Sequence, residues 1–226
     1  MLVLSQPTSK RTRVRVGWHD DFPEGASMAF IKTVPTAQAA GTLLEIYQED
    51  LKAKGYVANH TSAFSLRPEV YKAWQGLLAS IRSHMRLRRY ELVTLAAAQA
   101  LKCTYCMLAH GAVLRKNFFS AGELAAIARD FRNSGLPAEE VALMEFAQKV
   151  TLEPSRIEEK DFDQLREKGL SDEEILDVVL TVTARNFMSK TLDALGAEPD
   201  QALMELEPEL REALVIGRPF PSVSRR

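Results

Sequence analysis

The chain has 226 residues, of which 46% are hydrophobic and 26% are charged, and this composition is typical of a globular protein with one compact domain. Its formal net charge of −1 gives no reason to expect nucleic-acid binding. No apolar run approaches the roughly 20 residues of a membrane span, and the N-terminus lacks the apolar core of a secretory signal peptide, so we expect a cytoplasmic protein that binds neither nucleic acid nor membrane.

Residues 1–27 differ from the rest of the chain, because Pro, Gly, Ser and basic residues are scattered through them without a helical period. We interpret them as an N-terminal extension, either disordered or with one strand-like piece at 11–16. Met28 stands where ordered-looking sequence begins and is a candidate alternative translation start. We expect a helical domain over residues 28–218 and a tail over 219–226.

From about residue 36 the apolar residues recur at helical spacing, and no strand-like alternation follows residue 28. Glycines mark helix ends, prolines mark two starts, and Ser-x-x-Glu capping boxes at Ser120 and Ser171 mark two more. The pattern predicts an all-α fold with a loop at 56–66 and helices over 36–54, 68–81, 86–116, 120–134, 137–150, 157–168, 171–195 and 200–214. The segment 171–195 is apolar nearly all round, which predicts a place at the centre of the fold or in a subunit interface.

The two cysteines of the chain, Cys103 and Cys106, form a C-x-x-C pair, and His110 follows them at helical spacing. Offsets of four and seven residues place all three side chains on one helix face. At the start of a helix the partial positive charge lowers a thiol's pKa, the second thiol can close a disulfide, and an imidazole can move a proton. This pattern favours a redox site. Zinc binding by these residues, a static disulfide and inert core thiols are the alternatives.

With Glu91, which eleven residues separate from Cys103, the spacing E-x11-C-x-x-C-x3-H resembles the signature of the AhpD-like alkylhydroperoxidases in the carboxymuconolactone decarboxylase superfamily. Segments at 66–69, 171–176 and 195–200, with Trp74 and Asn186, resemble the longer, peroxidase-related branch, and the resemblance covers roughly residues 28–218.

The resemblance implies an AhpD-like helical bundle with the C-x-x-C at the start of a helix in a helical hairpin. It implies a cysteine-based peroxidase in which Cys106 attacks a hydroperoxide, Cys103 resolves the product as a disulfide, and Glu91 and His110 relay protons. A dithiol or thioredoxin-like donor then reduces the disulfide, no metal or other cofactor is needed, and the subunits form a homo-oligomer: a trimer, dimer or hexamer.

Helix geometry alone does not bring Glu91 to the thiols. On an unbroken helix, twelve residues place it about 120° round from Cys103. The chain must therefore turn near Leu101 and Lys102, where no Gly or Pro marks a break.

Tyr105 stands where some members of the family carry a histidine, which removes one member of a proton relay. It is a candidate for a hydrogen bond to a substrate oxygen, with core packing as the alternative. A redox-sensing or oligomeric interaction protein without significant turnover is the alternative to the enzyme, and lactone decarboxylation ranks last.

The remaining polar and aromatic residues receive plainer interpretations. We interpret the basic run over 82–89 as a solvated helix face, with lowering of a thiol pKa or docking of an acidic partner as its functional alternatives. We expect His19, His60 and His84 at the surface, and Trp74, Phe118 and Phe119 in the core or an interface.

Overall fold

The computed structural model describes residues 29–219, which form helices and connecting segments without a strand, so the all-α prediction is confirmed. The α-helices of this range are α1 (Gly41–Lys54), α2 (Asn59–Ala63), α3 (Pro68–Arg82), α4 (Leu87–Leu101), α5 (Thr104–Asn117), α6 (Ala121–Asp130), α7 (Ala138–Leu152), α8 (Glu159–Glu167), α9 (Asp172–Leu195) and α10 (Pro208–Leu214). Short 3-10 helices are η1 (Thr36–Gln38), η2 (Phe131–Asn133), η3 (Pro154–Arg156) and η4 (Gln201–Glu205). Among the described helices, none combines the length and apolar character needed to cross a membrane.

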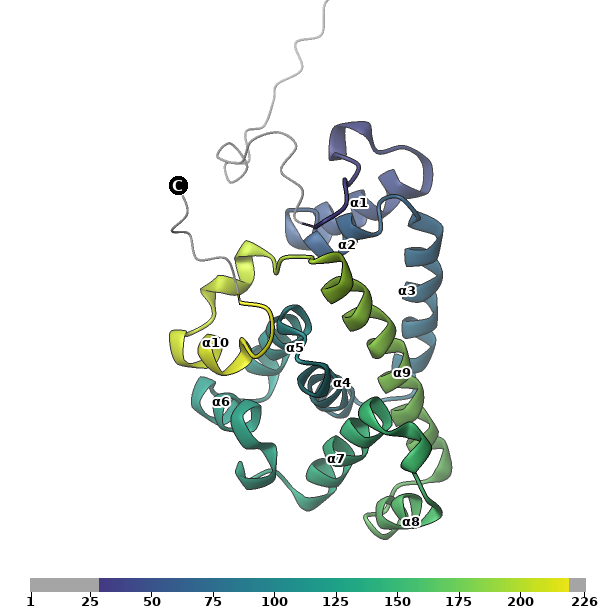
Figure 1. The fold of residues 1–226 in the computed structure, drawn as a ribbon, viewed down its shortest axis with the longest axis vertical. Coiled ribbons are helices and arrows are strands. Elements are labelled where there is room, and N and C mark those ends of the chain that lie inside the picture. The colour runs from purple at the N-terminus through teal and green to yellow at the C-terminus, as the bar shows by residue number, and fades with distance from the viewer. Residues whose placement is uncertain (1–28, 220–226) are drawn as a thin grey trace, which may run out of the picture.

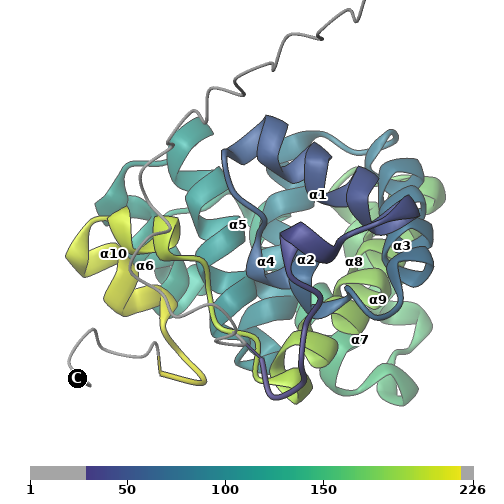
Figure 2. The ribbon, with the colours of Figure 1, turned by 90° about the horizontal axis from the view of Figure 1, so that it is seen from above.

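Helix α4 lies in the middle of the bundle, where it packs against α5, α7 and α9 (Figures 1 and 2). Residues 90–98 are all buried, including three consecutive alanines that allow neighbouring helices to approach closely. Glu91 belongs to this buried stretch and is only 3% exposed. A carboxylate in such a place requires a polar partner, and the partner identifies the site described below.

Helix α9 is the long helix beside α4, and it also packs against α3 and α7. Its start is fixed by a capping box, in which the Ser171 hydroxyl accepts the Glu174 amide and the Glu174 carboxylate accepts the Ser171 amide. It ends at Gly196, which adopts the left-handed conformation with φ 64°. Between these ends α9 carries Arg185 and Ser189 into the core.

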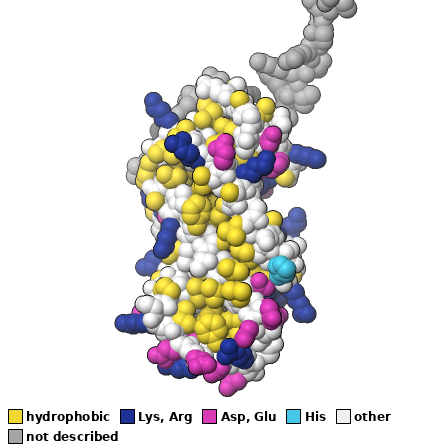
Figure 3. Space-filling view, turned by 90° about the vertical axis from the view of Figure 1, so that its right-hand side faces the viewer, with side chains coloured by type: hydrophobic (Ala, Val, Ile, Leu, Met, Phe, Trp, Pro, Cys, Tyr) yellow, Lys and Arg dark blue, Asp and Glu magenta, His cyan; other side chains and the backbone are white. Residues whose placement is uncertain are grey.

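One face of α3 and α9 remains apolar and exposed. Leu176, Leu180 and Phe187 are spaced by four and seven residues on α9, and Val70 and Leu77 by seven on α3. Figure 3 looks onto the side of the molecule where α3, α8 and α9 lie, and hydrophobic side chains run along it. The central place predicted for 171–195 is confirmed on one side of α9, which packs against α3, α4 and α7. Its place in a subunit interface stays a prediction.

The structure differs from the predicted helices in four places. The first helix begins at Gly41 after η1, the predicted loop at 56–66 contains α2, the helix predicted over 120–134 is divided into α6 and η2, and the last helix is divided into η4 and α10. The stretch 86–116 is divided into α4 and α5 at Lys102, where the approach of Glu91 to the thiols requires a turn. The predicted extension over 1–27, the candidate start at Met28 and residues 220–226 of the tail lie outside the described residues.

Candidate active site

The site begins at the sharp turn that separates α4 from α5. Lys102 ends α4 in the left-handed conformation with φ 57°, the one positive φ at a non-glycine residue in the described part of the chain. Its amide donates to the Gln99 carbonyl, and the Cys103 amide donates to the Ala98 carbonyl. The turn folds α5 back against α4, so that Glu91 faces the helix that carries the cysteines.

A segment from the far end of the chain packs on this turn. Gly217 lies so close to the Lys102 carbonyl that a Cβ at this position would come within 1.7 Å of the oxygen. The Gly217 amide donates to the Thr104 hydroxyl at 3.0 Å. The turn is therefore stabilised by a contact distant in sequence, and Gly217 has a packing reason to be glycine.

Both cysteines are buried free thiols at the start of α5. Cys103 is the N-cap residue and Cys106 is the third helical residue. The Cys103 thiol lies 3.8 Å from the Ser189 carbonyl oxygen, and the Ser189 hydroxyl donates to the Cys106 sulfur at 3.2 Å. Helix α9 thus contacts both sulfur atoms from the side opposite α5.

The environment makes the two thiols unequal. A hydrogen bond from the Cys103 thiol, the positive charge of Arg185 and the Ser189 hydroxyl together lower the pKa of Cys106, although burial opposes them. The same thiol–thiol bond, with burial, raises the pKa of Cys103. The electrostatics therefore favour Cys106 as the thiolate.

His110 connects Glu91 to Arg185. Its Nδ1 lies 2.6 Å from Glu91 Oε2, and its Nε2 lies 2.6 Å from Arg185 Nη2. A guanidinium can only donate, so Nε2 accepts from Arg185 and Nδ1–H donates to Glu91, which makes the imidazole neutral. Burial and the Arg185 charge lower the pKa of His110 against the effect of Glu91, in agreement with this assignment.

Tyr105 points away from this relay and forms its own polar cluster. Its hydroxyl donates to Asp200 Oδ2 at 2.7 Å, accepts from the His60 amide at 3.0 Å, and lies 2.9 Å from His60 Nδ1. Burial raises the pKa of Tyr105 and lowers that of His60 to about 3. The prediction that His60 lies at the surface without a partner is wrong, whereas His84 is exposed as expected.

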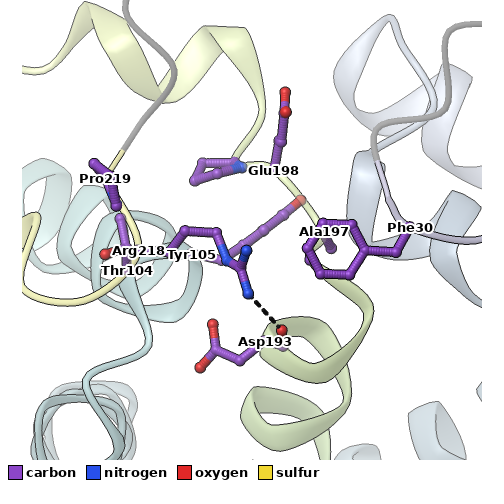
Figure 4. A pocket seen from close by; sticks show the side chains of 10 residues that line it. Phe30, Thr104, Tyr105, Asp193, Ala197, Glu198, Arg218 and Pro219 are labelled. Atoms are coloured by element: carbon purple, nitrogen blue, oxygen red, sulfur yellow. Dashed lines mark hydrogen bonds between the residues drawn. The ribbon is translucent and has the colours of Figure 1, made fainter.

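A pocket of about 80 Å³ opens beside Thr104 and Tyr105 (Figure 4). Asp193 of α9 forms part of its wall, and Arg218 reaches across it to donate to the Asp193 carbonyl at 3.0 Å. Burial raises the pKa of the Asp193 carboxyl, which lies within hydrogen-bonding reach of the Cys103 thiol. The pocket therefore lies on the Cys103 side of the thiol pair.

Two site residues are absent from the sequence prediction. Arg185 and Ser189 lie one turn apart on α9, which the sequence presents as an apolar core helix. The sequence signal for Arg185 is a lone arginine inside an apolar run, since a buried charge requires a partner or a function.

Residues given plainer interpretations are placed as follows. Arg88 pairs with Glu140, and Arg89 pairs with Glu139 and Glu174, so this part of the basic run holds helices together. Phe118 and Phe119 pack partly buried against the core.

Trp74 lies next to the site. Its indole N–H donates to the Ala184 carbonyl at 3.1 Å, and the Arg185 guanidinium carbon lies 5.3 Å from its ring centroid. The expectation of a core position thus holds, and the ring also supports a site residue.

Comparison with protein families matches residues 68–149 to the carboxymuconolactone decarboxylase family. The matched segment includes Glu91, Cys103, Cys106 and His110. None of the curated proteins compared with the chain matches it.

Solved structures share the fold. An uncharacterized peroxidase-related protein from Ralstonia eutropha JMP134 with an AhpD core is 22% identical, with a TM-score of 0.72 over 78% of this chain and 94% of its own. A peroxidase-related protein from Silicibacter sp. TM1040 is 21% identical, with a TM-score of 0.71 over 81% and 97%. The debrominase Bmp8, as a cysteine-to-alanine variant in complex with 2,3,4-tribromopyrrole, is 16% identical, with a TM-score of 0.62 over 80% and 94%.

These identities show a common fold and leave the reaction open, since a debrominase shares it with peroxidase-related proteins. The segment with the two cysteines therefore matches the carboxymuconolactone decarboxylase family, and the fold of the chain is similar to that of structures with an AhpD core.

Proposed function

We propose that the protein is a thiol-dependent peroxidase that reduces hydroperoxides through a dithiol–disulfide cycle of Cys106 and Cys103. The observation that carries the proposal is the asymmetry of the two thiols. Cys106 receives a hydroxyl donor, a thiol donor and the field of a guanidinium, all of which stabilise a thiolate at that sulfur. His110, which pairs with Glu91, follows Cys106 by one helical turn on α5.

In the first step the Cys106 thiolate attacks the terminal oxygen of the hydroperoxide ROOH. A sulfur–oxygen bond forms, the oxygen–oxygen bond breaks, and its electron pair leaves on the alkoxide RO⁻. The proton that left the Cys106 thiol passes through the Glu91–His110 pair to the alkoxide. The products are a sulfenic acid on Cys106 and the alcohol ROH.

In the second step the Cys103 sulfur attacks the sulfenic acid. The sulfur–sulfur bond forms, the sulfur–oxygen bond breaks, and the departing hydroxide takes the Cys103 proton to become water. A dithiol or thioredoxin-like donor then reduces the disulfide by exchange and is itself oxidised. We place the approach of the donor on the side of the pocket that Thr104 and Asp193 line, because this pocket lies next to the start of α5.

Zinc binding by the same residues is disfavoured by their partners. Arg185 donates to His110 Nε2, so a fixed positive charge lies at the nitrogen that would bind the metal. A guanidinium next to the thiols also repels a cation.

We also propose a homo-oligomer in the cytoplasm. The exposed apolar side chains of α3 and α9 support the homo-oligomer, because exposed apolar faces mark protein–protein interfaces (Figure 3). A reduced C-x-x-C pair is favoured by the cytoplasmic redox environment. Light scattering of the purified protein measures the oligomer, and a monomer at micromolar concentration would contradict the first part.

A steady-state assay with t-butyl hydroperoxide and a dithiol tests the proposal. We expect multiple turnovers per subunit in the wild type and no turnover in Cys103→Ser or Cys106→Ser. A redox sensor is the second candidate, since both thiols are buried. Stoichiometric oxidation without further cycling favours the sensor, and turnover that persists in Cys106→Ser contradicts both.

A further inference from the structure

Arg185 is a buried cation whose hydrogen-bonding capacity is only partly used. Its side chain lies in the middle of α9 and the residue is 7% exposed. Within the described part of the chain, its Nε and Nη1 atoms are buried and have no hydrogen-bond partner. Buried polar atoms are nearly always paired, so two unpaired donors on one charged group require an explanation.

The remaining contacts of Arg185 hold its guanidinium in place. Nη2 donates to His110 Nε2 at 2.6 Å, and the group lies over the ring of Trp74 at 5.3 Å. The indole in turn donates to the Ala184 carbonyl of the same helix. A purely structural role for Arg185 would explain the contacts of Nη2 with His110 and of the guanidinium with the Trp74 ring. It would not explain why Nε and Nη1 are buried without a partner.

The surroundings indicate which ligand chemistry the free donors accept. In the described residues Arg185 forms no direct ion pair with a carboxylate, because the ring of His110 lies between it and Glu91. Its positive charge acts on the Cys106 sulfur. A fixed cation with unused N–H groups beside a nucleophilic sulfur is suited to an oxygen atom that gains negative charge.

The proposed peroxidase reaction creates such an oxygen. As Cys106 attacks, negative charge moves from the sulfur to the departing alkoxide oxygen. An arginine remains protonated throughout, so it stabilises this charge by hydrogen bonds and donates no proton. The proton comes from the Glu91–His110 pair, to which Arg185 is joined through Nη2.

We infer that Arg185 is a catalytic residue that binds the oxygen atoms of the hydroperoxide through Nε–H and Nη1–H and stabilises the alkoxide as the oxygen–oxygen bond breaks. The inference rests on the proposed peroxidase function. It adds a residue from α9 to a site whose other reacting groups come from α4 and α5.

The test compares two reactions of the same sulfur. In a Cys103→Ser background Cys106 is the single cysteine of the chain, so its reactions with t-butyl hydroperoxide and with iodoacetamide are measured separately. Both rate constants are taken at a pH where alkylation has reached its plateau. The ratio of the peroxide rate to the alkylation rate then no longer depends on how easily the thiol ionises.

Arg185→Met removes the donors and Arg185→Lys keeps the charge with a different geometry. Lys190→Met removes a charge from the exposed face of the same helix and is the matched control. We expect the ratio to fall by about 100-fold in Arg185→Met, the loss typical of removing an oxyanion donor. In Arg185→Lys a loss of about tenfold is expected, because an ammonium does not reproduce the planar donors. The control keeps the wild-type ratio, and if Arg185→Met fails to fold, Arg185→Lys decides.

A ratio that stays at the wild-type value in Arg185→Met and Arg185→Lys overturns the inference and leaves the peroxidase proposal standing. A wild-type ratio no higher than that of free cysteine overturns the proposed function and this inference together. A ratio well above that of free cysteine that is lost with Arg185 supports both.

Discussion

The hydroxyl of Ser189 provides a direct test of how the site activates Cys106. It donates to the Cys106 sulfur at 3.2 Å from a residue that is 1% exposed. A hydrogen bond to a charged acceptor contributes about 1.5–3 kcal/mol, and one to a neutral acceptor about 0.5–1.5 kcal/mol. The thiolate is therefore favoured over the thiol by about 1.5 kcal/mol, which is roughly tenfold in the ionisation constant.

We expect Ser189→Ala to lower the ionisation constant of Cys106 by about tenfold. The assay is the rate of iodoacetamide alkylation against pH in a Cys103→Ser background, where serine retains a hydroxyl donor at position 103. The profile should move to higher pH while its plateau stays at the wild-type value. A melting curve checks that the variant remains folded.

Thr183→Val is the matched control, because the Thr183 hydroxyl lies on the exposed face of α9 and donates to the Val179 carbonyl. Its profile should coincide with that of the parent. A Ser189→Ala profile that also coincides with the parent would refute the reasoning, because the hydroxyl would then contribute nothing to thiolate stability.

Three further predictions follow from the relay, from His60 and from the turn. Glu91→Gln removes the charge that raises the pKa of His110, so NMR titration should find that pKa lower still, and peroxide turnover should fall by about 100-fold while alkylation at the plateau is unchanged. Burial lowers the pKa of His60 in the folded protein to about 3. Below pH 6.5 the unfolded state therefore binds more protons at His60 than the folded state does, and the free energy of unfolding should fall by up to about 1.4 kcal/mol per pH unit as the pH decreases. Urea unfolding at pH 7 and pH 5 should therefore show a smaller loss in His60→Gln, and an equal loss would contradict the assignment. Lys102→Gly should stabilise the fold by about 0.5–1 kcal/mol, because glycine adopts the left-handed backbone conformation of this position without strain. The control Lys190→Gly, inside a helix, should lower the stability by about 1 kcal/mol. A loss of stability in Lys102→Gly would contradict this account.

Helix boundaries set by local chemistry are predictable from the sequence. Ser171 and Glu174 form the expected capping box, and Gly196 ends α9 in the expected left-handed conformation. The break at Lys102 is different, because no glycine or proline marks it. It depends on a tertiary contact, in which Gly217 packs on the Lys102 carbonyl from 115 residues away. The helix α2 escapes prediction because five residues are too few for a periodic pattern.

The site residues that lie close together in the sequence are predictable, and those that come from distant helices are not. Cys103, Cys106 and His110 belong to one segment, so helical spacing predicts that they share a face. Glu91 enters only through the resemblance to a family, since its approach requires the unmarked turn. Ser189 and Arg185 come from a helix that is apolar for packing reasons, and single buried polar residues on such a helix give only a weak signal in one sequence.

Trapping of the sulfenic acid tests the central claim, that Cys106 is the attacking sulfur, most directly. Cys103→Ser and Cys106→Ser proteins are treated with t-butyl hydroperoxide in the presence of dimedone, and the adduct is located by mass spectrometry. The account predicts rapid labelling of Cys106 in Cys103→Ser and little labelling of Cys103 in Cys106→Ser, because the pKa of Cys106 is lowered and that of Cys103 is raised. Labelling of Cys103 as fast as that of Cys106, or no labelling of Cys106, would contradict it.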